Sequence, residues 1–280
     1  MSYEQYRPSS FKLLPDVVKN LLIINGLFFI ATYAFDARFH IDLTDYLGLH
    51  YFGSEKFRPW QFITYMFMHG SFAHIALNMF ALWMFGSSME NVWGPKRFLT
   101  FYIFTGLGAA LTHYVVVYYQ LSPVLHAIDN YVAQPDGISF KAFLDNPALF
   151  NMGIDNVQQN FQTFVHQYND LLLTDPPKAL QLSVDFMQQY RADYLNAPVV
   201  VGASGAVFGL LLAFGMTFPN NIIYVYFAIP LKAKYFVMIY GAIELYSGIN
   251  SSDNVAHFAH LGGMLFGIIL ILFWRRKFRF

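Results

Sequence analysis

The chain has 280 residues, of which 56% are hydrophobic and 12% charged, and its formal net charge is zero. This composition is more apolar and less charged than that of soluble domains, and the zero net charge gives no electrostatic support for a nucleic-acid partner. Because the chain has no cysteines, disulfides, thiolate metal sites and cysteine nucleophiles are excluded. The composition predicts an all-α polytopic protein of the lipid bilayer.

Six apolar stretches approach the length of about 20 residues that a helix needs to cross a membrane. The fifth is the weakest, because it is short and because Pro230 and Lys232 limit its extension. The first has no small-residue cleavage site after it, so we expect a retained span. The six predicted spans are Val17–Phe35, Phe72–Met89, Phe98–Tyr119, Val199–Phe218, Tyr235–Ile249 and Val255–Trp274.

Charge differs between the two sets of loops. The segment before the first span, every second loop and the tail hold most of the 17 basic residues, whereas the opposite loops carry most of the Asp. Because Lys and Arg concentrate on the cytoplasmic side, we expect both termini in the cytoplasm, as an N-terminal segment, 1–16, and a basic tail, 275–280. The membrane segments are then 17–120 and 199–274. Short loops favour a bacterial-type inner (plasma) membrane.

Two segments lie on the outer side in this topology. Residues 36–61 form the first outer loop, L1, which mixes polar and aromatic residues and suits an interfacial element. Residues 121–198 form a polar insertion between the third and fourth spans, and it is too long for a simple connection. Apolar residues at helical spacing predict amphipathic helices over Asn156–Leu173 and Ala179–Leu195. We therefore expect a helical extramembrane insertion.

Polar side chains occur in the second, fourth and sixth spans, which all run from the outer to the cytoplasmic side. His74 and Asn78 lie four residues apart and so share a helix face, Ser204 stands between glycines, and the sixth span carries His257 and His260. At about 1.5 Å of rise per residue, the hydroxyl, imidazole and amide reach one depth. Because polar groups in lipid are costly, we consider them candidate site residues.

Glycines four residues apart occur in two of these spans, as Gly205 and Gly209 in the fourth and as Gly263 and Gly267 in the sixth. Strips of small residues let two helix backbones pack closely in a membrane. Packing the fourth span against the sixth would bring Ser204 within reach of a histidine.

The polar residues and glycines form four motifs: His74-x-x-x-Asn78, the run from Gly86 through Glu90 to Gly94, Gly202-Ala-Ser-Gly205, and His260-x-x-Gly263-x-x-x-Gly267. Three of them lie in this order on the second, fourth and sixth spans, and together with the run after the second span they resemble the signature of rhomboid intramembrane serine proteases. The resemblance covers the core without the insertion. It implies a six-transmembrane-helix bundle that acts as a serine endopeptidase on transmembrane proteins, without a cofactor.

The resemblance also implies a role for each matching side chain. Ser204 would be the nucleophile and His260 its general base, as a dyad without an aspartate. The backbone N–H of Ser204, together with Asn78 and His74, would stabilise the oxyanion. Without a carboxylate to orient it, the base would be held by packing, and Phe208 is well placed to stack on it.

Several features depart from the family pattern or leave a choice open. Many members have Trp-Arg in L1, where this chain has Trp60 and Gln61, and often a Tyr where it has Phe208. The large insertion is unusual and bears on substrate access. His257 is an alternative base, but His260 is favoured because glycines follow it at the spacing of the family motif.

A metal site is one alternative to catalysis by serine. Its ligands would be His69, His74, His257 and His260. The His-Glu-x-x-His pattern is absent, and we expect no acidic residue beside these histidines at membrane depth. We therefore expect no metal, and we expect His69 to be structural.

Two further alternatives keep the polytopic fold but not the reaction. A transporter would use Asn78, Ser204 and Glu244 as a polar pathway, but the chain lacks inverted repeats with broken helices. The leading alternative is a catalytically silent rhomboid-like protein that binds membrane clients. Such proteins usually lack the serine or the histidine, and this chain keeps both.

Overall fold

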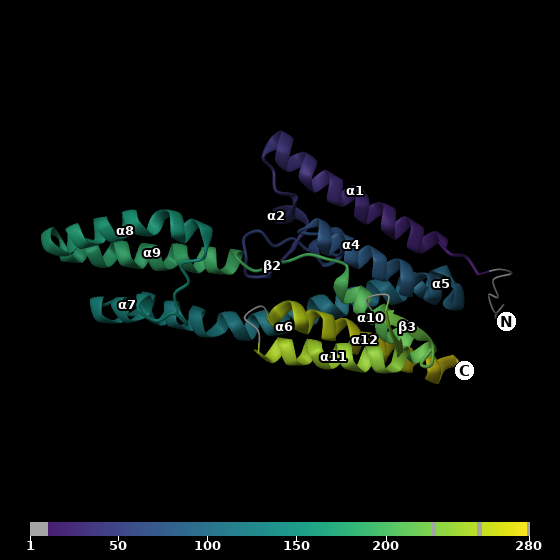
Figure 1. Ribbon diagram of the computed structural model, residues 1–280. Coiled ribbons are helices and arrows are strands. Elements are labelled where there is room, and N and C mark those ends of the chain that lie inside the picture. Colours follow the sequence, from purple (N-terminus) through teal and green to yellow (C-terminus); the bar gives the residue numbers. More distant parts are fainter. Residues whose placement is uncertain (1–10, 226–227, 251–253, 279–280) are drawn as a thin grey trace. The chain divides into compact units, whose positions relative to one another are not determined.

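A computed structural model describes residues 11–225, 228–250 and 254–278 (Figure 1). The first ten residues of the predicted N-terminal segment and the last two of the predicted basic tail therefore lie outside the described residues. The chain divides into two compact units. Unit 1 contains Met1–Leu49, Arg58–Tyr114 and Val200–Phe280, and unit 2 contains His50–Phe57 and Val115–Val199.

Helices make up most of the described chain. They are α1 (Asp16–Phe39), α2 (Leu43–Leu47), α3 (Gln61–Thr64), the 3-10 turn η1 (Tyr65–Phe67), α4 (Phe72–Ala81), the π-helical turn η2 (Leu82–Gly86), α5 (Ser87–Trp93), α6 (Pro95–Ala133), α7 (Gly137–Leu144), α8 (Asp155–Thr174), α9 (Pro176–Asn196), α10 (Ser204–Thr217), α11 (Ala233–Asn250) and α12 (Asn254–Phe278). Four short strands accompany them: β1 (Leu49–His50), β2 (Val199–Val200), β3 (Ile222–Val225) and β4 (Ile229–Lys232).

Four helical stretches of the described chain are long and apolar enough to cross a membrane. They are α1, the continuous run of α4, η2 and α5, α6, and residues Ala256–Arg275 of α12. The fourth and fifth predicted spans correspond to α10, a shorter apolar helix of 14 residues, and to α11, which has 18 residues. The prediction of an all-α polytopic membrane protein is confirmed.

The fourth predicted span begins later than expected. Residues Val199–Val200 form strand β2, which pairs with β1, and α10 starts only at Ser204. Between them, Gly202 has a φ of +126°, a backbone conformation that residues other than glycine rarely adopt. This backbone turn separates strand from helix, so Ser204 is the first residue of α10 and does not lie in the interior of the helix.

The helix α10 is at the centre of unit 1. Its residues from Gly205 to Gly215 are all buried except the half-buried Phe208. A helix that is apolar on every side is buried on every side. The glycines explain its contact with α12, because a Cβ at Gly263 would overlap the carbonyl oxygen of Gly205. The predicted close packing of these two helices is confirmed.

The side chain of Glu90 forms hydrogen bonds with the start of α1. Its two carboxylate oxygens accept from the backbone N–H groups of Val17, at 3.0 Å, and Val18, at 2.8 Å. The first N–H groups of a helix have no partner inside the helix, and the positive end of its dipole favours a carboxylate there. Glu90 therefore joins the end of the second predicted span to the start of the first.

The L1 loop is held by the side-chain amide of Gln61. The buried Gln61 accepts from the backbone N–H of Arg58, at 3.0 Å, and donates to the carbonyl of Tyr46, at 3.3 Å. The indole N–H of Trp60 donates to the same carbonyl, at 3.1 Å. Neutral hydrogen bonds thus brace this part of the loop.

Unit 2 has an aromatic core of its own. The predicted amphipathic helices are confirmed as α8 and α9, whereas α6 continues to Ala133, well past the predicted end of the third span at Tyr119. The continuation is explained by Val124, Ile128 and Tyr131, which lie at helical spacing and are buried. The core of unit 2 consists of Val124, Ile128, Tyr131, Phe140, Phe143, Phe150, Val157, Phe164, Met187 and Tyr190.

The segment before the fifth predicted span is a hairpin. Strands β3 and β4 pair antiparallel, with Ile222 opposite Lys232 and Val225 opposite Ile229. Pro230 lies in β4, at the edge of this two-stranded sheet, where a residue without an N–H is tolerated. The helix α11 therefore begins at Ala233, after Pro230 and close to the predicted start of the fifth span at Tyr235.

Candidate active site

Ser204 is half-buried and occupies the first position of α10. The turn before it is fixed by a hydrogen bond of 2.9 Å from the N–H of Gly202 to the carbonyl of Tyr65. The N-cap residue, Ala203, makes no side-chain capping hydrogen bond. Because the first N–H groups of a helix have no partner inside it, the start of α10 presents backbone donors beside the hydroxyl.

The Ser204 hydroxyl meets a histidine of another helix. Its Oγ lies 2.8 Å from Nε2 of His260, which α12 contributes. The ring of Phe208 is stacked on this imidazole, with 4.2 Å between centroids and an interplanar angle of 6°. Since Phe208 lies one turn after Ser204 on α10, one helix holds both the hydroxyl and the aromatic ring that faces the imidazole.

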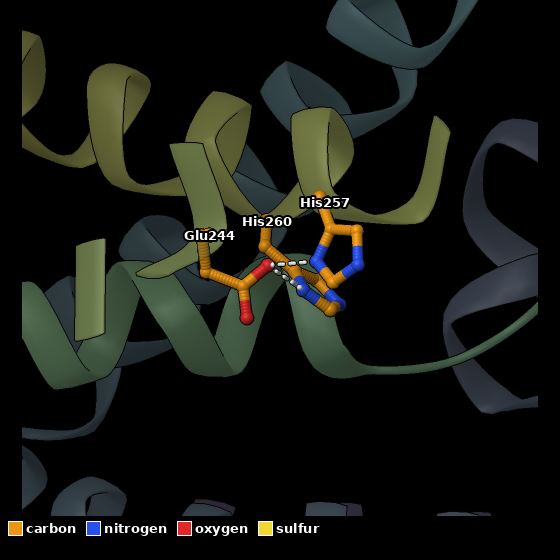
Figure 2. A group of neighbouring side chains, drawn as sticks. All are labelled: Glu244, His257 and His260. Atoms are coloured by element: carbon orange, nitrogen blue, oxygen red, sulfur yellow. Dashed lines mark hydrogen bonds and ion pairs between the residues drawn. The ribbon is translucent and has the colours of Figure 1, made fainter. Parts of the chain in front are cut away.

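A carboxylate lies on the other side of the same imidazole, contrary to the expectation that packing alone would hold it. Figure 2 shows Glu244 of α11 beside His257 and His260 of α12. Its Oε2 lies 3.0 Å from Nδ1 of His260 and 2.7 Å from Nδ1 of His257. The expectation that no acidic residue stands beside these histidines was therefore wrong.

Sequence reasoning did not find this contact, although a signal was present. Glu244 is an acidic residue within a predicted span, and such residues usually face the interior of the bundle and have a partner. Its partners lie on a neighbouring helix, and the sequence does not fix how two helices pack, so their identity could not be inferred. The structure supplies them because α11 and α12 pack side by side.

The predicted oxyanion residues lie on α4, close to the start of α10. The position that a Cβ would take at Gly202 is 2.8 Å from Nε2 of His74 and 3.7 Å from Oγ of Ser204. The imidazole of His74 and the hydroxyl of Ser204 thus both lie next to Gly202. Asn78 is buried and donates one amide N–H to the carbonyl of His74, at 3.0 Å.

His69 lies just before α4 and is buried beside this group. Its ring centroid is 4.9 Å from that of His74, and neither of its ring nitrogens has a hydrogen-bond partner among the described residues. Burial, together with the neighbouring imidazole of His74, lowers the pKa of His69 to about 4. His69 is therefore a neutral, packed ring at neutral pH.

The predicted alternatives for these histidines can now be compared. His257 contacts Glu244, while the hydroxyl of Ser204 contacts His260. The four histidines considered as metal ligands lie as two pairs, His69 with His74 and His257 with His260. Within the described part of the chain, the group able to hold a metal ion is Glu244, His257 and His260, whose ligand atoms lie within 4.8 Å of one another.

The fold and these contacts define a class: a helical membrane protein of several spans that holds a serine hydroxyl against a histidine of another helix. A sequence model of the Rhomboid domain matches residues 56–127 and 179–277, which is more than half of the chain. The chain belongs to the rhomboid family.

Similar proteins carry the same family name. Rhomboid protease GluP of Bacillus subtilis (strain 168) is 34% identical over 56 residues, which are 20% of this chain and 11% of that protein. Rhomboid protease AarA of Providencia stuartii is 35% identical over 63 residues, 22% of either chain. Rhomboid-like protein 11, chloroplastic, of Arabidopsis thaliana is 32% identical over 103 residues, 33% of this chain and 34% of that protein. These matches therefore span about a third or less of each relative.

Proposed function

We propose that this protein is an intramembrane serine endopeptidase that cleaves transmembrane proteins, with Ser204 as nucleophile and His260 as general base. The observation that carries the proposal is the hydrogen bond of 2.8 Å between Oγ of Ser204 and Nε2 of His260. A serine hydroxyl is a weak nucleophile unless a neighbouring base accepts its proton. Two of the relatives are named rhomboid proteases, which supports the same reaction.

The first half of the reaction forms an ester. As Oγ of Ser204 attacks the scissile carbonyl carbon, the hydroxyl proton moves to Nε2 of His260. The tetrahedral intermediate then collapses, the C–N bond breaks, and the imidazolium gives its proton to the leaving amine. The acyl group remains on Ser204. In the second half, His260 takes a proton from water, the resulting hydroxide attacks the ester, and Ser204 regains the proton as its C–O bond breaks.

The oxyanion would be stabilised from two helices. The backbone N–H of Ser204 lies at the start of α10, where the helix dipole is positive. His74 and Asn78 of α4 would donate from the other side. Donors that are already oriented toward the developing charge are usually the largest single contribution to such catalysis.

Substrates would be proteins whose transmembrane helix can unwind near one end. A peptide bond within a regular helix is not accessible to a nucleophile, so residues that break a helix should favour cleavage. In the proposed topology both termini lie in the cytoplasm of a bacterial-type cell and the site opens to the outer side of the inner membrane. The basic residues concentrated on alternate loops support this orientation.

A fluorophosphonate probe tests the nucleophile directly, because it labels activated serines. We expect the wild type to be labelled and Ser204→Ala to remain unlabelled. Cleavage of a single-span model substrate, with the same variant as control, separates a protease from the alternative of a silent client-binding protein. Equal labelling of both forms would show that Ser204 is not the nucleophile, and labelling without cleavage would favour client binding.

A further inference from the structure

We infer that Glu244 is a positioning residue of the proposed site: its carboxylate keeps the proton of His260 on Nδ1, so that Nε2 is free to accept the proton of Ser204. The inference rests on the proposed function and deepens it. A dyad needs no third side chain, and the resemblance to the rhomboid proteases implied none. In this chain a serine of α10, a histidine of α12 and a glutamate of α11 are joined in one hydrogen-bonded row.

The argument begins with the donors and acceptors of the three groups. An ionised carboxylate only accepts hydrogen bonds, so a ring nitrogen that faces it must carry a proton. Oε2 of Glu244 lies 3.0 Å from Nδ1 of His260. A neutral imidazole has one N–H, and when that N–H is at Nδ1 the lone pair is at Nε2. Nε2 is the atom that faces the Ser204 hydroxyl.

The same contact stabilises the charged state of the ring. When Ser204 attacks, the imidazole accepts its proton and becomes a cation. The N–H of Nδ1 then donates from a positive ring to a negative carboxylate, and such charge-assisted bonds are stronger than neutral ones. Glu244 therefore favours the protonated base that the proposed reaction requires, while the stack of Phe208 restrains the plane of the ring.

Burial shows that this glutamate is not present for solubility. The side chain of Glu244 is 8% exposed, whereas its neighbours in sequence, Ile243 and Leu245, are 52% and 48% exposed. The charged group thus faces the protein, and the apolar neighbours face outward. A buried charge is costly unless it is paired and hydrogen-bonded. Because the chain has few charged residues, a buried glutamate at this position indicates a specific role.

His257 completes the support of the carboxylate. Its Nδ1 donates to the same Oε2, at 2.7 Å, so two imidazoles of α12 share one acceptor. This second bond limits the orientations of Glu244 and offsets its burial. His257 is thereby assigned to holding the carboxylate, whereas His260, whose Nε2 faces the hydroxyl of Ser204, is the base.

The kinetics of labelling by the fluorophosphonate probe test the inference, with EDTA present so that no bound metal contributes. The saturating rate of labelling and the probe concentration at half-saturation are measured for the full-length wild type and for Glu244→Ala, Glu244→Gln and Glu244→Asp. Leu245→Ala, an exposed neighbour on α11, is the matched control. Thermal unfolding is recorded for every variant, and Ser204→Ala tests the proposed function.

We expect Glu244→Ala to lose about 10- to 100-fold of the saturating rate, a part of what a general base contributes. The half-saturating concentration should stay unchanged, because the probe still binds. Glu244→Gln keeps an acceptor without the charge and should lose less, and Glu244→Asp should recover part of the rate. His257→Ala should lose only a few-fold, and Leu245→Ala should match the wild type.

The outcomes separate the two proposals. Labelling of Glu244→Ala at the wild-type rate, with Ser204→Ala unlabelled, would overturn the positioning role and leave the nucleophile in place. Equal labelling of wild type and Ser204→Ala would overturn both. If every Glu244 variant, Asp included, lost rate only in proportion to lost thermal stability, Glu244 would be structural and the inference wrong. Abolition of labelling by His257→Ala alone would make His257 the base and also contradict it.

Discussion

Asn78 illustrates how one side chain can serve both its helix and the proposed reaction. It donates one N–H of its amide to the carbonyl of His74, four residues earlier on α4. An amide group has two N–H bonds, and the second is the one that we assign to the oxyanion. The bond within the helix thus fixes the orientation of the amide, and no ionisation is needed for it to donate.

Replacing Asn78 by Ala should therefore affect rate more than stability. The loss of one oxyanion donor costs about 10²–10³ in rate, so cleavage of a single-span substrate should fall by that factor. Asn25→Ala is the matched control, since Asn25 is buried and donates to Leu21 in the same way, on α1. Equal cleavage rates for the two variants would contradict the assignment of Asn78.

At the scale of elements, the contact between α10 and α12 decides whether Ser204 and His260 meet. The backbones approach so closely that a Cβ at Gly263 would overlap the carbonyl oxygen of Gly205. A Cβ at Gly205 would overlap the side chain of Ala109 on α6. Small residues allow such approach between helices in a membrane. The hydroxyl and the imidazole lie one residue before Gly205 and three before Gly263, so any separation of the helices would part them.

We predict that Gly263→Ala weakens both the fold and the site. Overpacking of this kind costs about 1–3 kcal/mol, and the probe should label Ser204 more slowly. Gly26→Ala is the control, because a Cβ there meets nothing within 4 Å and a helical Gly→Ala change adds stability, about 0.5–1 kcal/mol. Thermal unfolding in detergent measures both. A Gly263→Ala protein as stable and as reactive as Gly26→Ala would refute the close packing.

For the whole molecule, the division into two units places the candidate site in one unit and a second hydrophobic core in the other. Every candidate site residue lies in unit 1, whereas the aromatic core of unit 2 is formed by residues of the insertion. We therefore expect unit 2 to influence which substrates are cleaved more than how fast Ser204 reacts. Its position in the chain, directly before Ser204, motivates this hypothesis.

Phe140→Ala tests the separation. Phe140 is 2% exposed and lies in the core of unit 2, and removing such a ring costs about 3–5 kcal/mol. We expect a loss of stability in unit 2, altered cleavage of model substrates, and unchanged probe labelling of Ser204. Ile138→Ala, at an 85% exposed position of the same helix, should change none of these. Loss of probe labelling in Phe140→Ala would show that the units are not separable.

The sequence by itself determined what depends on local pattern. Apolar length predicted the membrane helices, and apolar spacing predicted α8 and α9, because burial of one helix face leaves its period in the chain. Motif spacing was sufficient to nominate Ser204 and His260, since each motif is a short continuous stretch of the chain. The length of α6 was missed. Its apolar residues continue at helical spacing past Tyr119, but they lie within a segment whose overall polar composition predicted a separate insertion.

Only the tertiary structure decided what depends on contacts between distant segments. The start of α10 at Ser204 follows from a glycine at positive φ whose N–H bonds to Tyr65. The carboxylate beside His260 comes from Glu244 of α11, and its partner depends on how that helix lies against α12. Neither could be read from the chain, because side chains meet across helices at distances that packing, and not sequence separation, sets.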